Sequence, residues 1–240
     1  MLLEICAFNL PAALAAQRAG ADRIELCCGP EEGGVTPSAG IIRAAREGLR
    51  IPLNCIIRPR EGDFLYSDDE FRVMLRDVEL CRGLGCDGVV VGMLLTDGSV
   101  DQARCSRLVE AAYPLGVTFH RAFDRVADPF VAMETIIGIG CERILTSGQR
   151  PVAMEGVELL RELVRAADER IVIMPGSGVR ASNIAELAAR TGAVEFHTSA
   201  RVAYRGKMEF VNEGMREDLS MVMVNEEEVR RIKEEMGRLL

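Results

Sequence analysis

Leu2-Leu-Glu-Ile-Cys6 and Arg23-Ile-Glu-Leu-Cys27 are two short runs in which apolar side chains alternate with other residues, and the alanine-rich stretch Pro11–Ala19 lies between them. Alternation with a period of two is typical of a β-strand, and the spacing of the apolar residues in the middle stretch favours a helix. This part of the chain therefore predicts a strand, a helix and a second strand, which is the unit from which parallel sheets are built.

The same unit recurs along the chain. Six more strand-like runs follow, at Leu53–Arg58, Gly88–Gly92, Val117–His120, Arg143–Ser147, Ile171–Met174 and Val194–His197. The other helix candidates lie between successive strands, and they are Ser38–Gly48, Asp68–Leu84, Val100–Ala112, Pro129–Ile139, Glu155–Ala167 and Ala181–Arg190. Eight such units predict an α/β fold, a (β/α)8 TIM barrel over about residues 1–200. A doubly wound sheet is the alternative, which the regular spacing and the lack of an opening glycine fingerprint disfavour.

The strand–helix repeat ends near residue 201, and we interpret residues 201–240 as a short appendage. Met208–Asn212 and Ser220–Val224 predict a hairpin, after which Asn225 is expected to cap a closing helix, with Glu228 at the capping-box spacing. Such a segment is too small for a core of its own, so we expect residues 1–240 to form a single domain. The methionine-rich hairpin is also a candidate association surface, which would suit a structural or interaction protein.

Charge and composition exclude several classes of function. The chain has 29 Lys and Arg against 37 Asp and Glu, a net charge of -8, so we expect no nucleic acid partner. Half of this excess lies in the tail, since Glu209–Leu240 has nine acids and five bases. Only Lys207 and Lys233 are lysines. Schiff-base chemistry and a P-loop both need a lysine amine, so neither fits the body of the chain.

The cysteines and the hydropathy pattern predict a compartment. The chain has eight cysteines, but it shows no secretory signal pattern and no apolar stretch near 20 residues. We therefore expect no membrane partner, a cytoplasmic location and cysteines that remain thiols.

Side-chain alternation predicts which residues point into the barrel, because alternate positions of a strand face the helices. The predicted inward set is polar and holds Glu4, Cys6, Glu25, Cys27, Arg58, Thr118, His120, Glu195 and His197. A purely structural barrel is filled by Val, Ile and Leu, so this set indicates either a buried ion-pair network or a functional site. Both histidines come at the carboxyl ends of strands, where barrel enzymes carry their chemistry, and this favours a site.

The loops after the strands add groups suited to an anion. Pro175-Gly-Ser-Gly-Val179 and Thr198-Ser199 follow the last two strands, where barrels bind phosphate through backbone N–H groups, although a tight turn also explains the glycines. Arginines gathered at one rim of an acidic protein favour an anionic ligand. The candidates for anion or substrate binding are Arg60, Asp63, Arg121, Ser147, Gly176, Ser177, Gly178 and Ser199.

Two chemistries fit the predicted mouth of the barrel. Cys6 and Cys27 occupy equivalent inward positions on neighbouring strands about 4.8 Å apart, so two thiolates could hold Cu(I), although plain packing of small residues explains the spacing as well. The alternative is an enzyme that acts on a small phosphorylated or otherwise anionic metabolite by proton transfer. Its catalytic candidates are Glu4, Glu25, Arg58, His120, Asp124 and His197. We interpret the remaining six cysteines as packing residues.

Eight motifs, in order, resemble the CutC family. They are Leu3-Glu-Ile-Cys6, Gly20-Ala-Asp-Arg-Ile-Glu-Leu-Cys27, Gly33-Gly-Val-Thr-Pro-Ser38, Ile57-Arg-Pro-Arg60, Gly62-Asp-Phe-Leu-Tyr-Ser67, Val117-Thr-Phe-His-Arg-Ala-Phe-Asp124, Arg143-Ile-Leu-Thr-Ser-Gly148 and Met174-Pro-Gly176. The resemblance runs from Leu3 to at least Ser199. It implies a cytoplasmic TIM-barrel protein of copper homeostasis that self-associates, with Cys6 and Cys27 as Cu(I) ligands. Copper handling leaves the charged residues at the mouth unexplained, so the enzyme alternative stays open.

The chain departs from the family pattern at two places. It has Arg60-Glu-Gly-Asp63 where the family typically has Arg-Gly-Gly-Asp, and Cys6-Ala-Phe-Asn9 where many members have Cys-Val-Asp-Ser. The first departure adds the Glu61 carboxylate at the rim, and the second removes an acidic neighbour from the loop after the first strand.

Overall fold

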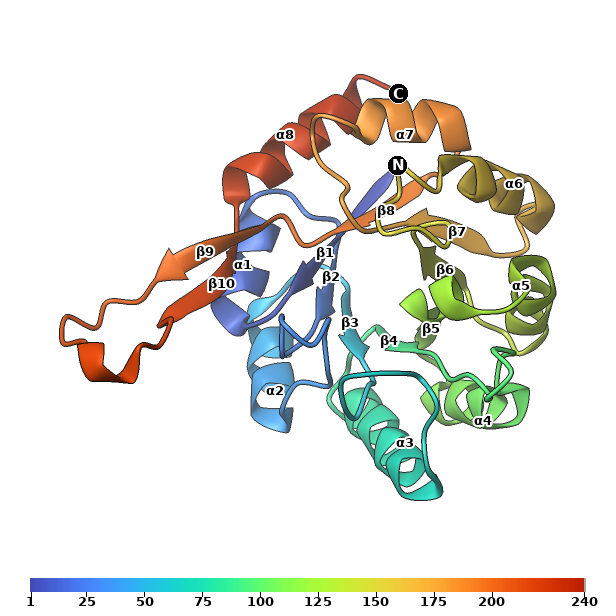
Figure 1. Ribbon diagram of the computed structural model, residues 1–240, viewed down its shortest axis with the longest axis horizontal. Helices are drawn as coiled ribbons and strands as arrows, with labels where there is room; N and C mark the ends of the chain where they lie inside the picture. The colour runs from blue at the N-terminus through green and yellow to red at the C-terminus, as the bar shows by residue number, and fades with distance from the viewer. Residues whose placement is uncertain (240) are drawn as a thin grey trace.

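The computed structural model describes residues 1–239 and confirms the predicted barrel (Figure 1). Eight parallel strands form one sheet in the order β7-β6-β5-β4-β3-β2-β1-β8, and β7 contacts β8 where the ring closes. The strands are β1 Leu2–Ala7, β2 Arg23–Leu26, β3 Leu53–Ile56, β4 Gly88–Val91, β5 Gly116–Phe119, β6 Arg143–Thr146, β7 Val172–Pro175 and β8 Glu195–Thr198.

Helices follow the strands and cover the outer face of the sheet (Figure 1). They are α1 Leu10–Arg18, α2 Ala39–Gly48, α3 Asp68–Gly83, α4 Gln102–Ala112, α5 Pro129–Gly138, α6 Val157–Ala167 and α7 Ile184–Thr191, with the 3-10 turn η1 Arg121–Arg125 after β5. Local sequence sets their starts. Ser67 and Glu70, for example, form a reciprocal capping box at the start of α3, each side chain accepting from the other's backbone N–H.

The two faces of the strands separate two environments, as alternation predicts. Leu3, Ile5, Ile24 and Leu26 are completely buried in the large core between the sheet and the helices. The residues between them point the other way, and Cys6 and Cys27 pack inside the barrel in a small separate cluster. The interior is therefore free to hold polar groups, because the stability of the barrel comes from the apolar layer outside it.

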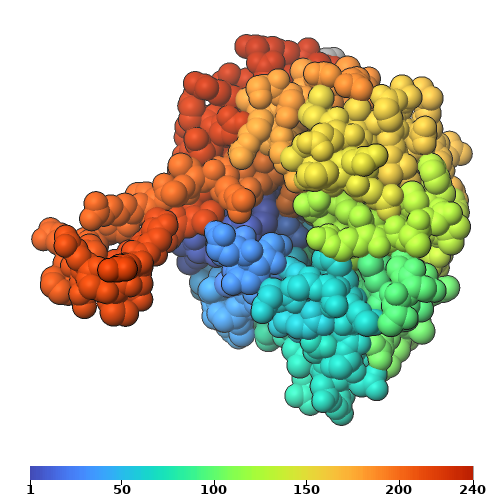
Figure 2. Space-filling model, viewed as in Figure 1, coloured from blue at the N-terminus to red at the C-terminus, as the bar shows by residue number. Residues whose placement is uncertain are grey.

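The C-terminal hairpin projects from the barrel as an arm (Figures 1 and 2). Strand β9 (Arg201–Arg205) pairs antiparallel with β10 (Ser220–Val224). The predicted strand over Met208–Asn212 was wrong, because the register pairs Val224 with Arg201 and the partner strand therefore begins directly after β8. Residues 208–212 instead lie in the connection, next to the 3-10 turn η2 (Glu213–Met215).

Helix α8 (Glu226–Gly237) brings the chain back onto the barrel against α1 and α7. The predicted cap is confirmed, because the Glu228 N–H donates to Asn225 Oδ1 at 3.1 Å. The Glu228 carboxylate does not complete a capping box. It accepts from the Ala181 N–H at 3.0 Å and so ties α8 to the loop between β7 and α7. None of the described helices has the length and apolar character that crossing a membrane requires.

Candidate functional site

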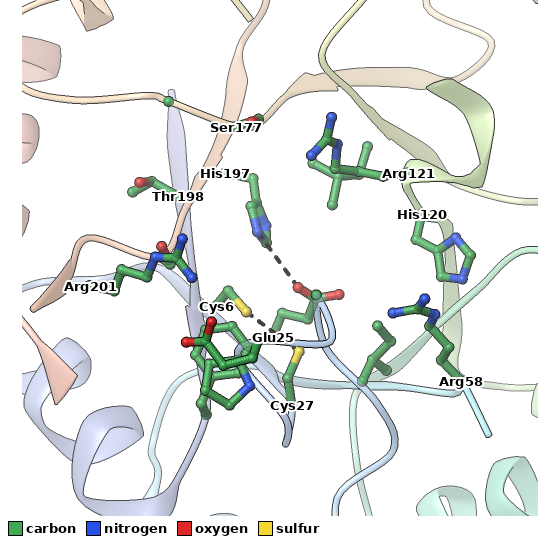
Figure 3. Close-up of a pocket in the computed structure, with 18 of the residues that line it drawn as sticks. Cys6, Glu25, Cys27, Arg58, His120, Arg121, Ser177, His197, Thr198 and Arg201 are labelled. Carbon is green, nitrogen blue, oxygen red and sulfur yellow. Dashed lines mark hydrogen bonds and ion pairs between the residues drawn. The ribbon is translucent and has the colours of Figure 1, made fainter. Parts of the chain in front are cut away.

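A cavity of about 440 Å³ opens at the carboxyl ends of the strands (Figure 3). The structure brings many of the predicted site residues together in its lining, namely Cys6, Glu25, Cys27, Arg58, His120, Arg121, Ser177, Gly178, His197 and Ser199. Glu4, Asp124, Ser147 and Gly176 lie directly behind this lining, whereas Arg60 and Asp63 pair with each other outside it.

The Glu4 carboxylate lies at the centre of a buried chain of charges. Arg23 donates from Nε to Glu4 Oε2, and His197 Nδ1 lies 2.8 Å from Glu4 Oε1. Burial alone would raise the pKa of Glu4, but the hydrogen bond from His197 and the charge of Arg23 outweigh it and lower the pKa to about 2. Glu4 therefore stays ionised and fixes the orientation of His197.

Two arginines that the sequence analysis did not select complete this network of buried ion pairs. Arg23 Nη2 donates to Glu195 Oε2 at 2.7 Å, and Arg143 Nε donates to the same oxygen at 3.2 Å. Arg23 has the same strand parity as Glu25, so alternation could have identified it. Ion pairs thus occupy the barrel interior behind the cavity lining, as the alternative of a buried network expects.

His197 connects this ion-pair chain to the cavity. Its Nε2 atom lies 3.6 Å from Glu25 Oε2 (Figure 3). Burial opposes protonation of the ring, but its contacts with Cys6 and Glu4 and the nearby carboxylates raise the pKa of His197 to about 10. Burial, with the charge of Cys6 added, raises the pKa of Glu25 well above its usual range. Environments that push two carboxyl pKa values apart are typical of acid–base sites, and here the pKa of Glu4 is lowered and that of Glu25 is raised.

Cys6 and Cys27 lie side by side on the floor of the cavity (Figure 3). Their Sγ atoms are 3.4 Å apart, and with Glu25 they form a group whose possible ligand atoms all lie within 4.8 Å of one another. The hydrogen bond with Cys27 lowers the pKa of Cys6 to about 6 against the effect of burial, with help from His197. Burial and the neighbouring sulfur raise the pKa of Cys27. Near neutral pH the pair therefore holds one thiolate and one thiol.

His120 lies across the cavity from the thiols (Figure 3) and is 4% exposed. Its Nδ1 atom accepts from the Ala122 N–H at 3.1 Å, which leaves the ring proton on Nε2. That Nε2 atom is buried with no partner among the described residues. Burial lowers the pKa of His120 to about 3, and the charge of Arg58 adds to the effect. His120 is therefore a neutral group with an N–H left to donate, which suits recognition of a ligand.

Arg58 lines the cavity but is largely committed to the fold. Its Nη1 atom donates to the carbonyls of Glu32 and Gly34, and its Nη2 atom donates to the carbonyl of Gly62. These bonds tie the loop after β2 to the loop after β3. Its Nε atom is buried without a partner in residues 1–239, so this N–H is free to donate to a ligand.

Arg121 lies at the edge of the cavity and is oriented from behind. It donates from Nε to Asp124 and from Nη2 to Ser147, each at 2.8 Å. Asp124 and Ser147 are therefore positioning groups for Arg121 and do not line the cavity themselves. Their proximity follows from the pairing of β5 with β6, since each residue follows one of these strands.

Two further arginines in the lining were missed because they lie in loops without periodicity. Arg180 follows β7 and Arg201 begins β9, and neither guanidinium has a hydrogen-bond or ion-pair partner within residues 1–239. The backbone N–H groups of Ser177, Gly178 and Ser199 likewise donate to no protein acceptor in the described part of the chain. Unpaired cations beside free N–H groups form an electropositive patch at this side of the mouth.

Gly176 brings this loop close to the buried charges. A Cβ at this position would lie 2.4 Å from Leu145 Cδ1 and 3.4 Å from the Cβ of His197. Ser177, the next residue, has a φ of 73°, which is rare and strained for a residue with a side chain. A larger residue at 176 would therefore push the end of the Leu145 side chain aside and would touch His197.

The fold and the site define a TIM-barrel protein with paired thiols and buried charges at the carboxyl ends of its strands. Residues 1–202 match the model of the CutC family. The chain belongs to the CutC family.

Individual relatives agree with this assignment. A CutC family protein from Parabacteroides distasonis is 50% identical over 236 residues, which span 98% of this chain and 97% of the relative. The crystal structure of a protein from Streptococcus agalactiae, described as a copper homeostasis protein CutC, has a TM-score of 0.80 at 33% identity and covers 83% of this chain and 98% of its own. Phosphoribosylanthranilate isomerase from Thermotoga maritima shares only the fold, with a TM-score of 0.62 at 12% identity over 99% of both chains.

Replacing Glu4 should be strongly destabilising. Glu4→Gln leaves Arg23 and His197 with buried charges that have lost a partner, which typically costs about 3–5 kcal/mol in the free energy of unfolding. Urea unfolding of both proteins measures this difference. Glu134→Gln, which breaks an exposed pair with Arg170, is the matched control and should change stability little. Equal effects of the two substitutions would show that Glu4 is not central to the interior.

Neutral His120 should make stability depend on pH. Below pH 6.5 the unfolded chain binds a proton at this histidine, whereas the folded chain does so only near pH 3. The contribution of neutral His120 to the free energy of unfolding is therefore complete above pH 6.5. It is lost as the pH falls toward 3, with a slope approaching about 1.4 kcal/mol per pH unit. His120→Gln keeps an acceptor and a donor but cannot titrate. Chemical unfolding between pH 7 and 5 should show a shallower loss in this variant, and parallel curves would refute the assignment.

Proposed function

We propose that this protein binds Cu(I) through Cys6 and Cys27 and takes part in copper handling in a reducing cytoplasm. The observation that carries the proposal is the pair of Sγ atoms 3.4 Å apart on the cavity floor. Thiolates are soft ligands that favour Cu(I), and the two sulfur atoms lie in one group with Glu25. The description of the S. agalactiae protein as a copper homeostasis protein supports the same role here.

The charges around the two thiols suit a bound Cu(I) ion. Two thiolates and one Cu(I) ion have a net negative charge, and a buried charge needs a counter-ion. The His197 imidazolium lies beside Cys6 and supplies that counter-ion, while protonated Glu25 adds no further negative charge. Glu4 and His197 also belong to a donor group with Glu25, but Glu4 is already engaged by Arg23. The thiol pair is therefore the better site for a soft ion.

The Cys6→Ser/Cys27→Ser variant should hold one Cu(I) ion fewer per chain than the wild-type protein. Hydroxyl groups are hard, weakly acidic ligands that do not replace thiolates for Cu(I). An anaerobic titration against a competing Cu(I) chelator measures the stoichiometry. Cys28→Ser removes a neighbouring thiol outside the cavity lining and is the control, with no ion lost. An unchanged stoichiometry in the double variant would rule out the mouth site.

A second candidate function is an enzyme acting on a small phosphorylated or otherwise anionic metabolite. The observation that favours it is the patch of unpaired Arg180 and Arg201 beside the free N–H groups of Ser177, Gly178 and Ser199. Barrels bind phosphate at this place, after the seventh and eighth strands. An anion held there would direct the rest of the molecule into the cavity, where protonated Glu25 and the Cys6 thiolate could act as acid and base.

Removing the two free cations should weaken anion binding. Each charge-assisted hydrogen bond is worth about 1.5–3 kcal/mol, so Arg180→Gln/Arg201→Gln should weaken the affinity for a bound phosphate compound by roughly tenfold or more. Thermal-shift titration with inorganic phosphate and a set of phosphorylated metabolites provides the measurement. Arg190→Gln, on the outer side of α7 and paired with Glu186, is the control. If no anion raises the melting temperature of the wild-type protein, this function fails.

The proposal includes a homo-oligomer, as the family resemblance implies. Eight of the sixteen exposed large apolar side chains of the described residues lie on the projecting arm: Val202, Tyr204, Met208, Phe210, Val211, Met215, Leu219 and Met221. Exposed apolar side chains at this density are typical of an association surface. Light scattering that gives the mass of a single chain at micromolar concentration would contradict self-association.

A further inference from the structure

Three cysteines form a second thiol cluster on the outer side of the barrel wall, and we propose that this cluster binds one Cu(I) ion independently of Cys6 and Cys27. Cys55 lies in β3, Cys81 lies on α3 and Cys86 lies in the turn before β4. All three are buried, and their Sγ atoms lie within 4.8 Å of one another. The sequence analysis interpreted these cysteines as packing residues, because their spacing along the chain matches no ordinary metal motif.

The end of α3 holds two of the three sulfur atoms together. The Cys86 N–H donates to the Cys81 carbonyl at 3.1 Å, and the Gly85 N–H donates to the Arg82 carbonyl at 3.2 Å. Gly85 has a φ of 77°, so these bonds form a Schellman motif. In this motif the residues in the positions of Cys81 and Cys86 commonly make a side-chain contact. Cys81 and Cys86 are therefore placed side by side by the backbone of the turn.

The third sulfur atom comes from the outer face of the sheet. Cys55 alternates with Ile56, which packs against Cys6 and Cys27 inside the barrel, so Cys55 points toward the helices. Its Sγ atom lies 3.7 Å from that of Cys86. In a trigonal site with three metal–sulfur bonds of about 2.3 Å, neighbouring sulfur atoms are about 4 Å apart, close to this separation. The spacing of Cys55 and Cys86 therefore fits a shared ion without movement of the backbone.

The donor set favours Cu(I) among the soft ions. Among the His, Cys, Asp and Glu side chains of residues 1–239, the group contains three sulfur atoms and no fourth ligand, whereas structural zinc sites almost always use four. Thiolates select Cu(I). The Asp87 carboxylate, which follows Cys86 in sequence, already accepts from Arg46 at 2.5 Å and from the Leu53 N–H at 2.8 Å. The Arg46 guanidinium places a positive charge beside the cluster, which offsets part of the negative charge of a copper thiolate.

Binding at this cluster is an exchange of protons for the ion. Each sulfur that forms a bond to Cu(I) loses its S–H proton to solvent, and no electron is transferred. Cys86 is 4% exposed, whereas Cys55 and Cys81 are completely buried, so the ion enters beside Cys86. Cys86 precedes β4, which puts this entrance at the amino ends of the strands, away from the cavity mouth. The two copper sites are therefore loaded from different ends of the barrel.

The test uses the Cys6→Ser/Cys27→Ser protein, in which the mouth pair is absent. Titrated anaerobically against a competing Cu(I) chelator, it should still hold one ion per chain, and X-ray absorption should show three sulfur neighbours around copper. Adding Cys55→Ala/Cys86→Ala should remove that ion. The matched control adds Cys105→Ala/Cys141→Ala, which removes two buried thiols outside the cluster and should leave the ion bound.

A second measurement does not depend on whether the proteins with substitutions in the cluster fold. Cu(I) bound only by the folded state should raise the melting temperature of the Cys6→Ser/Cys27→Ser protein, and this measurement needs no substitution in the cluster. Absence of both binding and a melting shift in this protein would overturn the proposal, as would loss of the ion in the Cys105→Ala/Cys141→Ala control. Failure of the mouth site has a different result, in which the wild-type and Cys6→Ser/Cys27→Ser proteins bind equal amounts of copper.

Discussion

The ion pairs of Glu4 with Arg23 and His197 connect the fold to the chemistry of the cavity. In the sheet, Glu4 is the direct partner of Arg23 on β2 and of His197 on β8. The three charged side chains therefore meet on one face only if β1 keeps this register with both neighbours, since a slip of one residue turns a strand's side chains over. The state of the cavity floor depends on the same contact, because Glu4 holds the imidazolium that lies beside Cys6 and Glu25.

The floor and the rim of the cavity carry different chemical groups and come from different parts of the fold. Cys6, Glu25 and His197 come from strands and Cys27 follows β2 directly, so their positions are fixed by the hydrogen bonds of the sheet. Arg180 and Arg201, which have no partner in the described part of the chain, come from the loop after β7 and from the base of the arm. A metal ion would need only the floor, whereas an anionic metabolite would use both. This is why two functions fit one cavity, and why substitutions at the floor and at the rim separate them.

Alternation along strands predicted the barrel interior well, because it rests on backbone geometry that every strand shares. It placed Glu4, Glu25 and His197 correctly on the inner face, and the same rule would have found Arg23. Alternation says nothing about which strands pair, and so Met208–Asn212 was assigned to a hairpin strand that Arg201–Arg205 forms instead.

Groups assembled by packing were beyond sequence reasoning. Cys55, Cys81 and Cys86 come from a strand, a helix and a turn, so no single period relates them. Arg60 follows Arg58 closely in sequence, yet its contacts with Asp63 and Glu70 hold it outside the cavity. Arg180 and Arg201 lie where no repeating pattern applies. In each case the deciding information is a contact between segments that are distant or irregular in the sequence.

The lack of lysine before residue 207 has a consequence for how the site responds to its surroundings. Every cationic side chain at the rim is a guanidinium, which keeps its charge at any physiological pH. The floor holds a thiol, a carboxyl group and an imidazole, whose protons can be redistributed. A change in acidity, or the arrival of a ligand, can therefore reset the reactivity of the floor while the attraction of the rim for anions stays constant. The attraction of anions by the rim and the protonation of the floor groups can thus vary independently within one cavity.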